Sequence, residues 1–209
     1  MRFVTYEGIE GSGKSTQLAR AAERLREAGR SVLATREPGG TPLGEALRKL
    51  LVPPSEGEDT LDPVAEWLLY EADRRQHVRD VLKPAIARGE IVLCDRYSDA
   101  TEAYQRAGRG VDPDAIARVD ALARDGLVPD LTLLFDLEPE AGLARAVARD
   151  GGRPGRFEAA SLDFHRRVRE AYLEIARREP SRVVLIDAAR SPDEVFAEAW
   201  EILRRKVGA

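Results

Sequence analysis

Residues 8–15 have the types and the spacing needed to bind a chain of phosphate groups. They read Gly-Ile-Glu-Gly-Ser-Gly-Lys-Ser, a glycine followed by four residues and then Gly-Lys-Ser. Glycines let successive backbone N–H groups point at an anion, Lys14 supplies a positive charge, and Ser15 offers a hydroxyl group to a magnesium ion on the terminal phosphates. A glycine-rich turn can also simply join a strand to a helix. The lysine and serine at these offsets favour a nucleoside triphosphate site.

Two polar segments farther along the chain could complete such a site. Asp95 and Arg96 follow a short apolar run, and a carboxylate at that point is placed to hold magnesium or its waters. In the tight loop 35–42, proline and paired glycines could aim Arg36 at a phosphate, although a solvated arginine in a turn is an equal alternative. Asp136 is a rival metal ligand, but we favour a helix-capping role for it.

A helix predicted over residues 63–87 carries a candidate pair for reading a nucleobase. Tyr70 and Arg74 are four residues apart and so share one helix face. The aromatic ring could stack on a base while the guanidinium bonds to the edge of that base. Aromatic and aliphatic residues at helical spacing are more often part of the core, and we assign Trp67 and Leu68 to it.

A second arginine cluster surrounds a glycine-rich break in the predicted helices. Arg145 and Arg149 lie one helical turn apart, and Arg153 and Arg156 follow in the segment Asp-Gly-Gly-Arg-Pro-Gly-Arg at 150–156. Such a segment between two helices is typical of a mobile lid that closes over phosphates and brings positive charge to the transition state. A solvated basic loop is the alternative.

The elements that must position these residues alternate regularly along the chain. Short apolar runs separated by helical patterns are typical of a parallel sheet with crossover helices. Continuously apolar strands, as expected when both faces are covered, are predicted at residues 3–7, 31–35, 91–95, 131–136 and 183–187. Helices are predicted near residues 14–28, 42–51, 63–87, 101–106, 113–125, 139–149, 159–178 and 192–206. Residues 1–209 then form a single α/β domain that binds ligands beyond the carboxyl ends of its strands.

Composition excludes several classes of protein. Of the 209 residues, 43% are hydrophobic and 33% are charged, which predicts a folded chain, and no apolar run is as long as a membrane span. The N-terminus leads directly into a predicted strand, so we expect no signal peptide. The net charge of −4 argues against extensive nucleic-acid binding. The single cysteine, Cys94, is expected to be buried and fits a reducing, cytoplasmic location. His77 and His165 lack metal-ligand spacing and are predicted at the surface.

Taken together, the motifs resemble those of thymidylate kinases over essentially the whole chain. Besides residues 7–15, the matching segments are Thr-Arg-Glu-Pro-Gly-Gly-Thr at 35–41, Asp-Arg-Tyr at 95–97, Ala-Tyr-Gln at 103–105, Gly-Arg-Gly at 108–110 and Pro-Asp-Leu-Thr at 129–132. The resemblance implies a P-loop nucleoside monophosphate kinase fold with a five-stranded parallel sheet flanked by helices. It also implies a homodimer that uses ATP and magnesium to convert dTMP to dTDP in dTTP synthesis.

The resemblance further implies roles for individual residues. Catalytic roles fall to Lys14, Asp95, Arg96, Arg149 and Arg153, and magnesium would be held by Ser15 and Asp95. ATP would be bound by Gly8, Ile9, Glu10, Gly11, Ser12, Gly13, Lys14, Ser15, Thr16 and Arg145. The dTMP substrate would be bound by Glu10, Arg36, Tyr70, Arg74, Arg96, Thr101 and Tyr104.

The resemblance also implies which part of dTMP several of these residues would contact. Glu10 would face the deoxyribose 3′-hydroxyl group, and Tyr104 would crowd the 2′ position. Tyr70 would stack on thymine, with Arg74 and Thr101 bonding to the edge of the base. The family has one layout with a catalytic arginine inside the phosphate loop and another with arginines in the lid. Gly11 occupies the loop position, so the chain resembles the bacterial type, with a lid around residues 145–158.

Two other functions compete with this interpretation. A kinase for another nucleoside monophosphate would differ in only a few contacts to the base. An ATP-dependent switch or binding module belongs to a different class, but it would leave Arg36, Tyr70 and Arg74 without an acceptor to read. A guanine-specific switch needs an Asn-Lys-x-Asp motif, which the sequence does not contain.

Overall fold

Five parallel strands form one sheet in the order β2-β3-β1-β4-β5 in the computed structural model, which describes residues 2–52, 61–149, 157 and 160–208. The strands are β1 (Phe3–Glu7), β2 (Val32–Arg36), β3 (Ile91–Asp95), β4 (Leu131–Asp136) and β5 (Val183–Asp187). Each lies within one residue of its predicted range. The sheet and its flanking helices confirm the predicted α/β fold.

Most helices also follow the predicted pattern. They are α1 (Lys14–Glu27), α2 (Pro42–Leu51), α3 (Pro63–His77), α4 (Lys83–Ala87), α5 (Ser98–Thr101), α6 (Pro113–Arg124), α7 (Pro139–Arg149), α8 (Leu162–Arg178) and α9 (Pro192–Val207). Two π-helical segments, Val78–Leu82 and Glu102–Gly108, follow α3 and α5. The first of them precedes Pro84, which has no N–H group to donate to the preceding turn, so the predicted helix 63–87 is not one regular α-helix.

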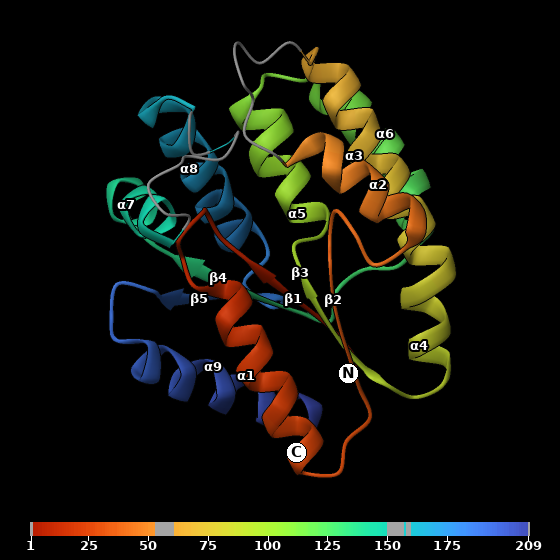
Figure 1. Cartoon of the computed structure of the whole chain (residues 1–209), viewed down its shortest axis with the longest axis vertical. Coiled ribbons are helices and arrows are strands. Elements are labelled where there is room, and N and C mark those ends of the chain that lie inside the picture. The colour runs from red at the N-terminus through yellow and green to blue at the C-terminus, as the bar shows by residue number, and fades with distance from the viewer. Residues whose placement is uncertain (1, 53–60, 150–156, 158–159, 209) are drawn as a thin grey trace.

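The helices cover the sheet from two sides (Figure 1). Helices α1 and α9 lie together on one side, and α5 and α8 lie on the other. Almost every residue of the central strands β1, β3 and β4 is buried between these layers. Strands β2 and β5 have a neighbour on one side only and are partly exposed, so the prediction that all strands are covered is wrong for these two.

The burial of three side chains corrects the sequence prediction. Leu68 is 47% exposed, because it lies on the face of α3 that points away from the core. His77 is fully buried, since its ring has polar partners at both nitrogens, Thr35 Oγ1 at 2.8 Å and Glu37 Oε1 at 3.0 Å. His165 is buried as well, with its Nε2 atom 2.9 Å from a backbone carbonyl oxygen. A histidine in a charged sequence context can therefore lie in the interior when the fold supplies partners.

Other burial predictions are confirmed. Trp67 is in a small apolar cluster with Val111 and Ile116, and Cys94 is a free, buried thiol. Among the described helices, none combines the length and the apolar composition that crossing a bilayer requires.

Candidate functional site

A cavity at the carboxyl ends of β1, β2 and β3 gathers most of the predicted site residues. Strand register brings these ends together, since Arg36 pairs with Asp95 and Tyr6 pairs with the same residue from the other side. The cavity is lined, among others, by the predicted residues Glu10, Gly11, Lys14, Ser15, Arg36, Tyr70, Arg74, Asp95, Arg96, Thr101, Tyr104 and Arg149. Residues separated by more than a hundred positions in the sequence therefore share one site.

Helix α1 begins at this cavity without a side-chain cap. Its N-cap residue is Gly13, with φ 84°, which has no side chain to accept a hydrogen bond. In α2, α3 and α6 the side chains of Thr41, Asp62 and Asp112 accept bonds from the first N–H groups of the helix. The first N–H groups of α1 therefore stay available to an anionic ligand.

The glycine-rich loop before α1 packs tightly against α7. Gly11 has φ 70°, and an ideal Cβ atom built there would overlap the carbonyl oxygen of Gly142. A Cβ atom on Gly142 would in turn lie 2.5 Å from the carbonyl oxygen of Glu10. Any residue other than glycine at position 11 would have to push α7 away from the loop.

Lys14 places its ammonium group inside this loop. The residue is 8% exposed, and Nζ donates a hydrogen bond to the carbonyl oxygen of Ile9 at 3.2 Å. Burial and the charge of Arg96 lower the pKa of Lys14, and nearby carboxylates such as Asp95 only partly oppose this. A bound phosphate chain would supply the negative charge that such a buried cation needs.

Ser15 and Asp95, the two predicted metal ligands, are in contact. The Ser15 hydroxyl group donates a hydrogen bond to Asp95 Oδ2. Among the described residues, the buried Oδ1 atom of Asp95 has no hydrogen-bond partner. A hydroxyl oxygen beside a carboxylate with an unused oxygen is a donor set that fits Mg²⁺.

Arg96 is held under strain at the centre of the cavity. Its backbone has φ 68°, which is rare for a residue other than glycine. Its Nη2 atom donates to Glu10 Oε1 at 2.7 Å and to the Tyr104 hydroxyl group at 3.0 Å, and that hydroxyl group donates to Glu10 at 2.7 Å. Burial alone would raise the pKa of Glu10, but the charges of Arg96 and Lys14 outweigh it, so the pKa is lowered. Glu10 is therefore a carboxylate inside the cavity.

Tyr70 and Arg74 both line the cavity, as their predicted shared helix face requires. Arg74 is 2% exposed and donates through Nε to Glu37 Oε2 at 3.0 Å. Its Nη1 atom lies 2.7 Å from Glu71, 2.9 Å from Thr101 Oγ1 and 3.2 Å from Asp120. These contacts fix the plane of the guanidinium at the cavity wall.

Arg36 lies at the outer edge of the cavity. Its Nη2 atom is 2.9 Å from both carboxylate oxygens of Glu45, and about half of its side chain is exposed. Arg48, which the sequence pattern did not single out, also lines the cavity and donates to the carbonyl oxygen of Pro38 at 3.1 Å. Burial lowers the pKa of Arg48, and the neighbouring Arg36 lowers it further. The two arginines form a positive patch at this edge.

Some predicted residues do not line the cavity. They are Gly8, Ile9, Ser12, Gly13, Thr16 and Arg145. Arg145 instead donates to the carbonyl oxygens of Ala188 at 2.9 Å and Ala189 at 3.5 Å. Arg149 lines the cavity from the end of α7, whereas Arg153 and Arg156 lie outside the described residues.

Asp136 has neither of the two roles considered for it. Both of its oxygens accept hydrogen bonds from Arg169, at 2.7 and 3.0 Å. Helix α7 begins three residues later, at Pro139, so the favoured capping role is wrong. The aspartate is instead held in a bidentate ion pair outside the cavity.

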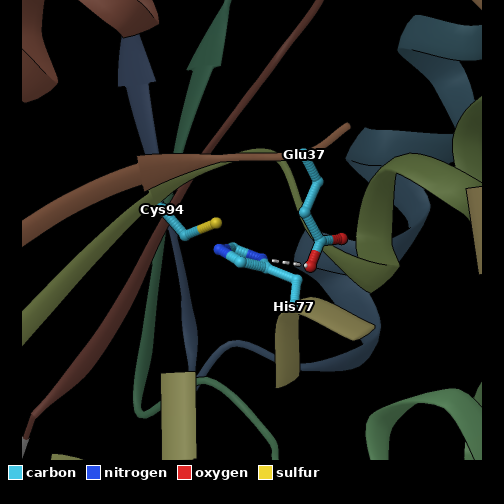
Figure 2. A group of neighbouring side chains, drawn as sticks. All are labelled: Glu37, His77 and Cys94. Carbon is cyan, nitrogen blue, oxygen red and sulfur yellow. Dashed lines mark hydrogen bonds and ion pairs between the residues drawn. The ribbon is translucent and has the colours of Figure 1, made fainter. Parts of the chain in front are cut away.

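Glu37, which lines the cavity, forms a buried group with His77 and Cys94 that resembles a metal site in composition only (Figure 2). Figure 2 shows the Glu37 carboxylate bonded to one side of the His77 ring and the Cys94 sulfur atom on the other side. The thiol donates to the carbonyl oxygen of Arg96 at 3.2 Å, and burial raises the pKa of Cys94 well above its usual value. Because each donor atom already has a partner, we interpret this group as structural support for the cavity floor.

Comparisons with known proteins agree on one family. The family model described as thymidylate kinase matches residues 6–199. The thymidylate kinase of Deinococcus radiodurans is 52% identical over 198 residues, covering 95% of this chain and 94% of that protein. The thymidylate kinase of Oleidesulfovibrio alaskensis is 54% identical over 201 residues, covering 94% of each. The crystal structure of thymidylate kinase from Ehrlichia chaffeensis superimposes with a TM-score of 0.78 at 34% identity, covering 97% of this chain and 98% of that chain.

Proposed function

The chain belongs to the thymidylate kinase family, and from this premise we propose that it transfers the γ-phosphoryl group of ATP to dTMP, giving ADP and dTDP. The observation that carries the proposal is the single cavity in which Lys14 and Ser15 of the phosphate loop face Arg96, Tyr70 and Arg74. A phosphate loop alone would serve any nucleotide-binding protein. The second set of residues supplies a place for an acceptor nucleotide.

The phosphate loop would bind ATP. The uncapped N–H groups of α1 and the buried ammonium group of Lys14 favour the β- and γ-phosphates. Ser15 and Asp95 would hold Mg²⁺, which neutralises charge on the transferring phosphoryl group when it is bound. Arg149, with Arg153 of the proposed lid at 145–158, would add positive charge to the transition state.

The other half of the cavity would bind dTMP. Arg96, fixed by Glu10 and Tyr104, would face the acceptor phosphate, with Arg36 at the outer edge. Tyr70 would stack on thymine, and Arg74 and Thr101 would bond to its edge. Glu10 and Tyr104 would read the deoxyribose. The acceptor is already an anion, so positioning and charge neutralisation account for most of the catalysis and no strong general base is needed.

An acceptor assay tests the proposal directly. With ATP and Mg²⁺ present, we expect ADP release with dTMP and the highest kcat/KM for dTMP among dTMP, dUMP, UMP, CMP and GMP. The measurement is a coupled assay for ADP together with chromatographic detection of the nucleoside diphosphate. A higher kcat/KM for another acceptor would identify a different nucleoside monophosphate kinase. ADP release that needs no acceptor would instead indicate an ATP-dependent switch.

We also propose that the protein is a cytoplasmic homodimer that pairs through α3 and α6. Large apolar side chains are exposed on these adjacent helices: Val64 at 46%, Leu68 at 47% and Leu122 at 73%. Leu68 and Leu122 also line one shallow groove between the two helices. Large apolar side chains exposed on two adjacent helices favour association with a second copy.

Replacing Leu122 with glutamate should separate the two copies. We expect the dissociation constant of the dimer to rise by about 30-fold or more, because a charge would be buried at a central apolar contact. Analytical ultracentrifugation over a range of concentrations measures this change. Leu185→Glu, at a leucine that is 46% exposed on β5, is the matched control. A wild-type chain that sediments as a monomer at all concentrations would contradict the proposal.

A further inference from the structure

The guanidinium of Arg96 is anchored on two sides, and only one of them belongs to the acceptor site described above. On the first side, Nη2 donates to the Tyr104 hydroxyl group, which donates to the carboxylate of Glu10. On the second side, Nη1 donates to the Tyr172 hydroxyl group at 3.3 Å, and that hydroxyl group donates to Glu7 Oε2 at 2.8 Å. Each arm thus runs from arginine through a tyrosine to a glutamate.

The second arm also holds the backbone. The remaining oxygen of Glu7, Oε1, accepts a hydrogen bond from the N–H group of Tyr97 at 2.6 Å. Tyr97 directly follows Arg96, whose φ of 68° is strained for an arginine. Glu7 therefore fixes the turn that carries Arg96 as well as the hydroxyl group that orients its guanidinium. Neither Glu7 nor Tyr172 lines the cavity.

The side chains of Glu7 and Tyr172 in the second arm are buried and therefore need partners within the protein. Glu7 is fully buried and Tyr172 is 2% exposed, so neither can exchange its partners for water. Burial and the charge of Asp99 raise the pKa of Glu7, which is about 8 when all of its neighbours are included. Arg96 and the bonds from Tyr172 and Tyr97 act in the opposite direction, because they favour the carboxylate. Hydrogen bonds from the Tyr172 hydroxyl group and the Tyr97 N–H group thus hold both oxygens of Glu7 in place.

The second arm connects three parts of the fold. Arg96 follows β3, Glu7 is the last residue of β1, and Tyr172 lies in α8. The Tyr172 hydroxyl group accepts a hydrogen bond from Arg96 and donates one to Glu7, so its orientation is fixed from both sides. Such a bond chain restricts rotation of the guanidinium, which matters most where a planar group must meet a phosphate.

We propose that Glu7 and Tyr172 are positioning residues that hold the guanidinium of Arg96 in place for the phosphate group of the acceptor nucleotide. The inference rests on the proposed function, since it assumes that Arg96 faces the phosphate of dTMP. It gives Tyr172 of α8, which does not line the cavity, an indirect role in binding the acceptor phosphate. The residues proposed to contact the sugar and the base, such as Glu10 and Tyr70, do not belong to this second arm.

Tyr172→Phe tests the proposal because it removes one oxygen atom and keeps the ring in the core. We expect the KM for dTMP to rise about tenfold, the change associated with one hydrogen bond to a charged group. The KM for ATP should stay unchanged. The inhibition constant of thymidine, competing with dTMP, should also stay unchanged, because thymidine has no phosphate for Arg96 to bind.

Tyr6→Phe is the matched control. Tyr6 is a fully buried tyrosine of β1 whose hydroxyl oxygen has no hydrogen-bond partner among the described residues. Removing that oxygen should leave all three constants at their wild-type values. Glu7→Gln should raise the KM for dTMP as Tyr172→Phe does, and the double variant should show much less than the product of the two effects, because both act through one arm.

The outcomes separate the inference from the proposed function. A Tyr172→Phe variant with a wild-type KM for dTMP, or one that weakens thymidine and dTMP equally, would overturn the inference even if Glu7→Gln fails to fold. A wild-type enzyme that does not phosphorylate dTMP would instead contradict the proposed function. The inference is supported when wild type is active on dTMP and only the phosphate-bearing acceptor is bound more weakly by Tyr172→Phe.

Discussion

Replacing Lys14 with methionine is expected to lower kcat by about a thousandfold, the upper range for removing one preorganised group that stabilises transition-state charge. Methionine keeps an unbranched side chain of similar length, so the stem of the residue can stay packed in the loop. The ammonium group is lost at a site that is 8% exposed, where water can do little to replace it. Steady-state kinetics with saturating ATP, dTMP and Mg²⁺ measure the change.

Lys206→Met is the control for this experiment, since Lys206 is exposed in the last turn of α9, away from the cavity. Thermal unfolding of both variants checks that the fold is kept. We expect Lys14→Met to be no less stable than wild type, because burial lowers the pKa of Lys14 and its removal relieves a buried charge. A folded Lys14→Met variant with more than a tenth of the wild-type kcat would contradict a catalytic role.

The sequence predicted which residues meet at the strand ends. It did not predict the buried residues that hold them in place. Ser15 and Asp95 are 80 positions apart, yet their contact follows from the rule that ligands bind beyond the carboxyl ends of parallel strands. Glu7 and Tyr172 are 165 positions apart, and their bond depends on the exact packing of α8 against the sheet. No local pattern indicates which buried tyrosine reaches which carboxylate.

His77 is another residue whose surroundings could not be predicted from the local sequence. A charged neighbourhood in the sequence predicted a surface position for His77, but Asp73 and Arg74, two of its charged neighbours on α3, are themselves buried. The partners that make its burial possible are Thr35 of β2 and Glu37, the residue that follows this strand. Local periodicity can identify an element and its ends, whereas polar partners supplied by distant elements decide which charged or polar residues are buried.

Gly11 is a position where the sequence and the structure support one another. The sequence places no arginine in the phosphate loop, and the structure shows that α7 leaves no space for one, because a Cβ atom on Gly11 would overlap the backbone of Gly142. The same helix ends with Arg149 at the cavity. The close packing of the loop on α7 thus excludes an arginine at position 11, and the same helix places Arg149, the proposed source of catalytic charge, at the cavity.

Arg149→Ala is therefore expected to lower kcat by about a thousandfold, as when the arginine that stabilises phosphoryl transfer is removed, while the dissociation constant of dTMP stays within about twofold of wild type. Single-turnover kinetics measure the chemical step, and calorimetric titration with dTMP measures binding. Arg166→Ala is the matched control, since Arg166 is an exposed arginine of α8 that pairs with Glu140. Adding Gly11→Arg to Arg149→Ala should not restore turnover, because the new side chain cannot fit against α7. A wild-type rate for Arg149→Ala, or full rescue by Gly11→Arg, would show that the catalytic charge comes from elsewhere.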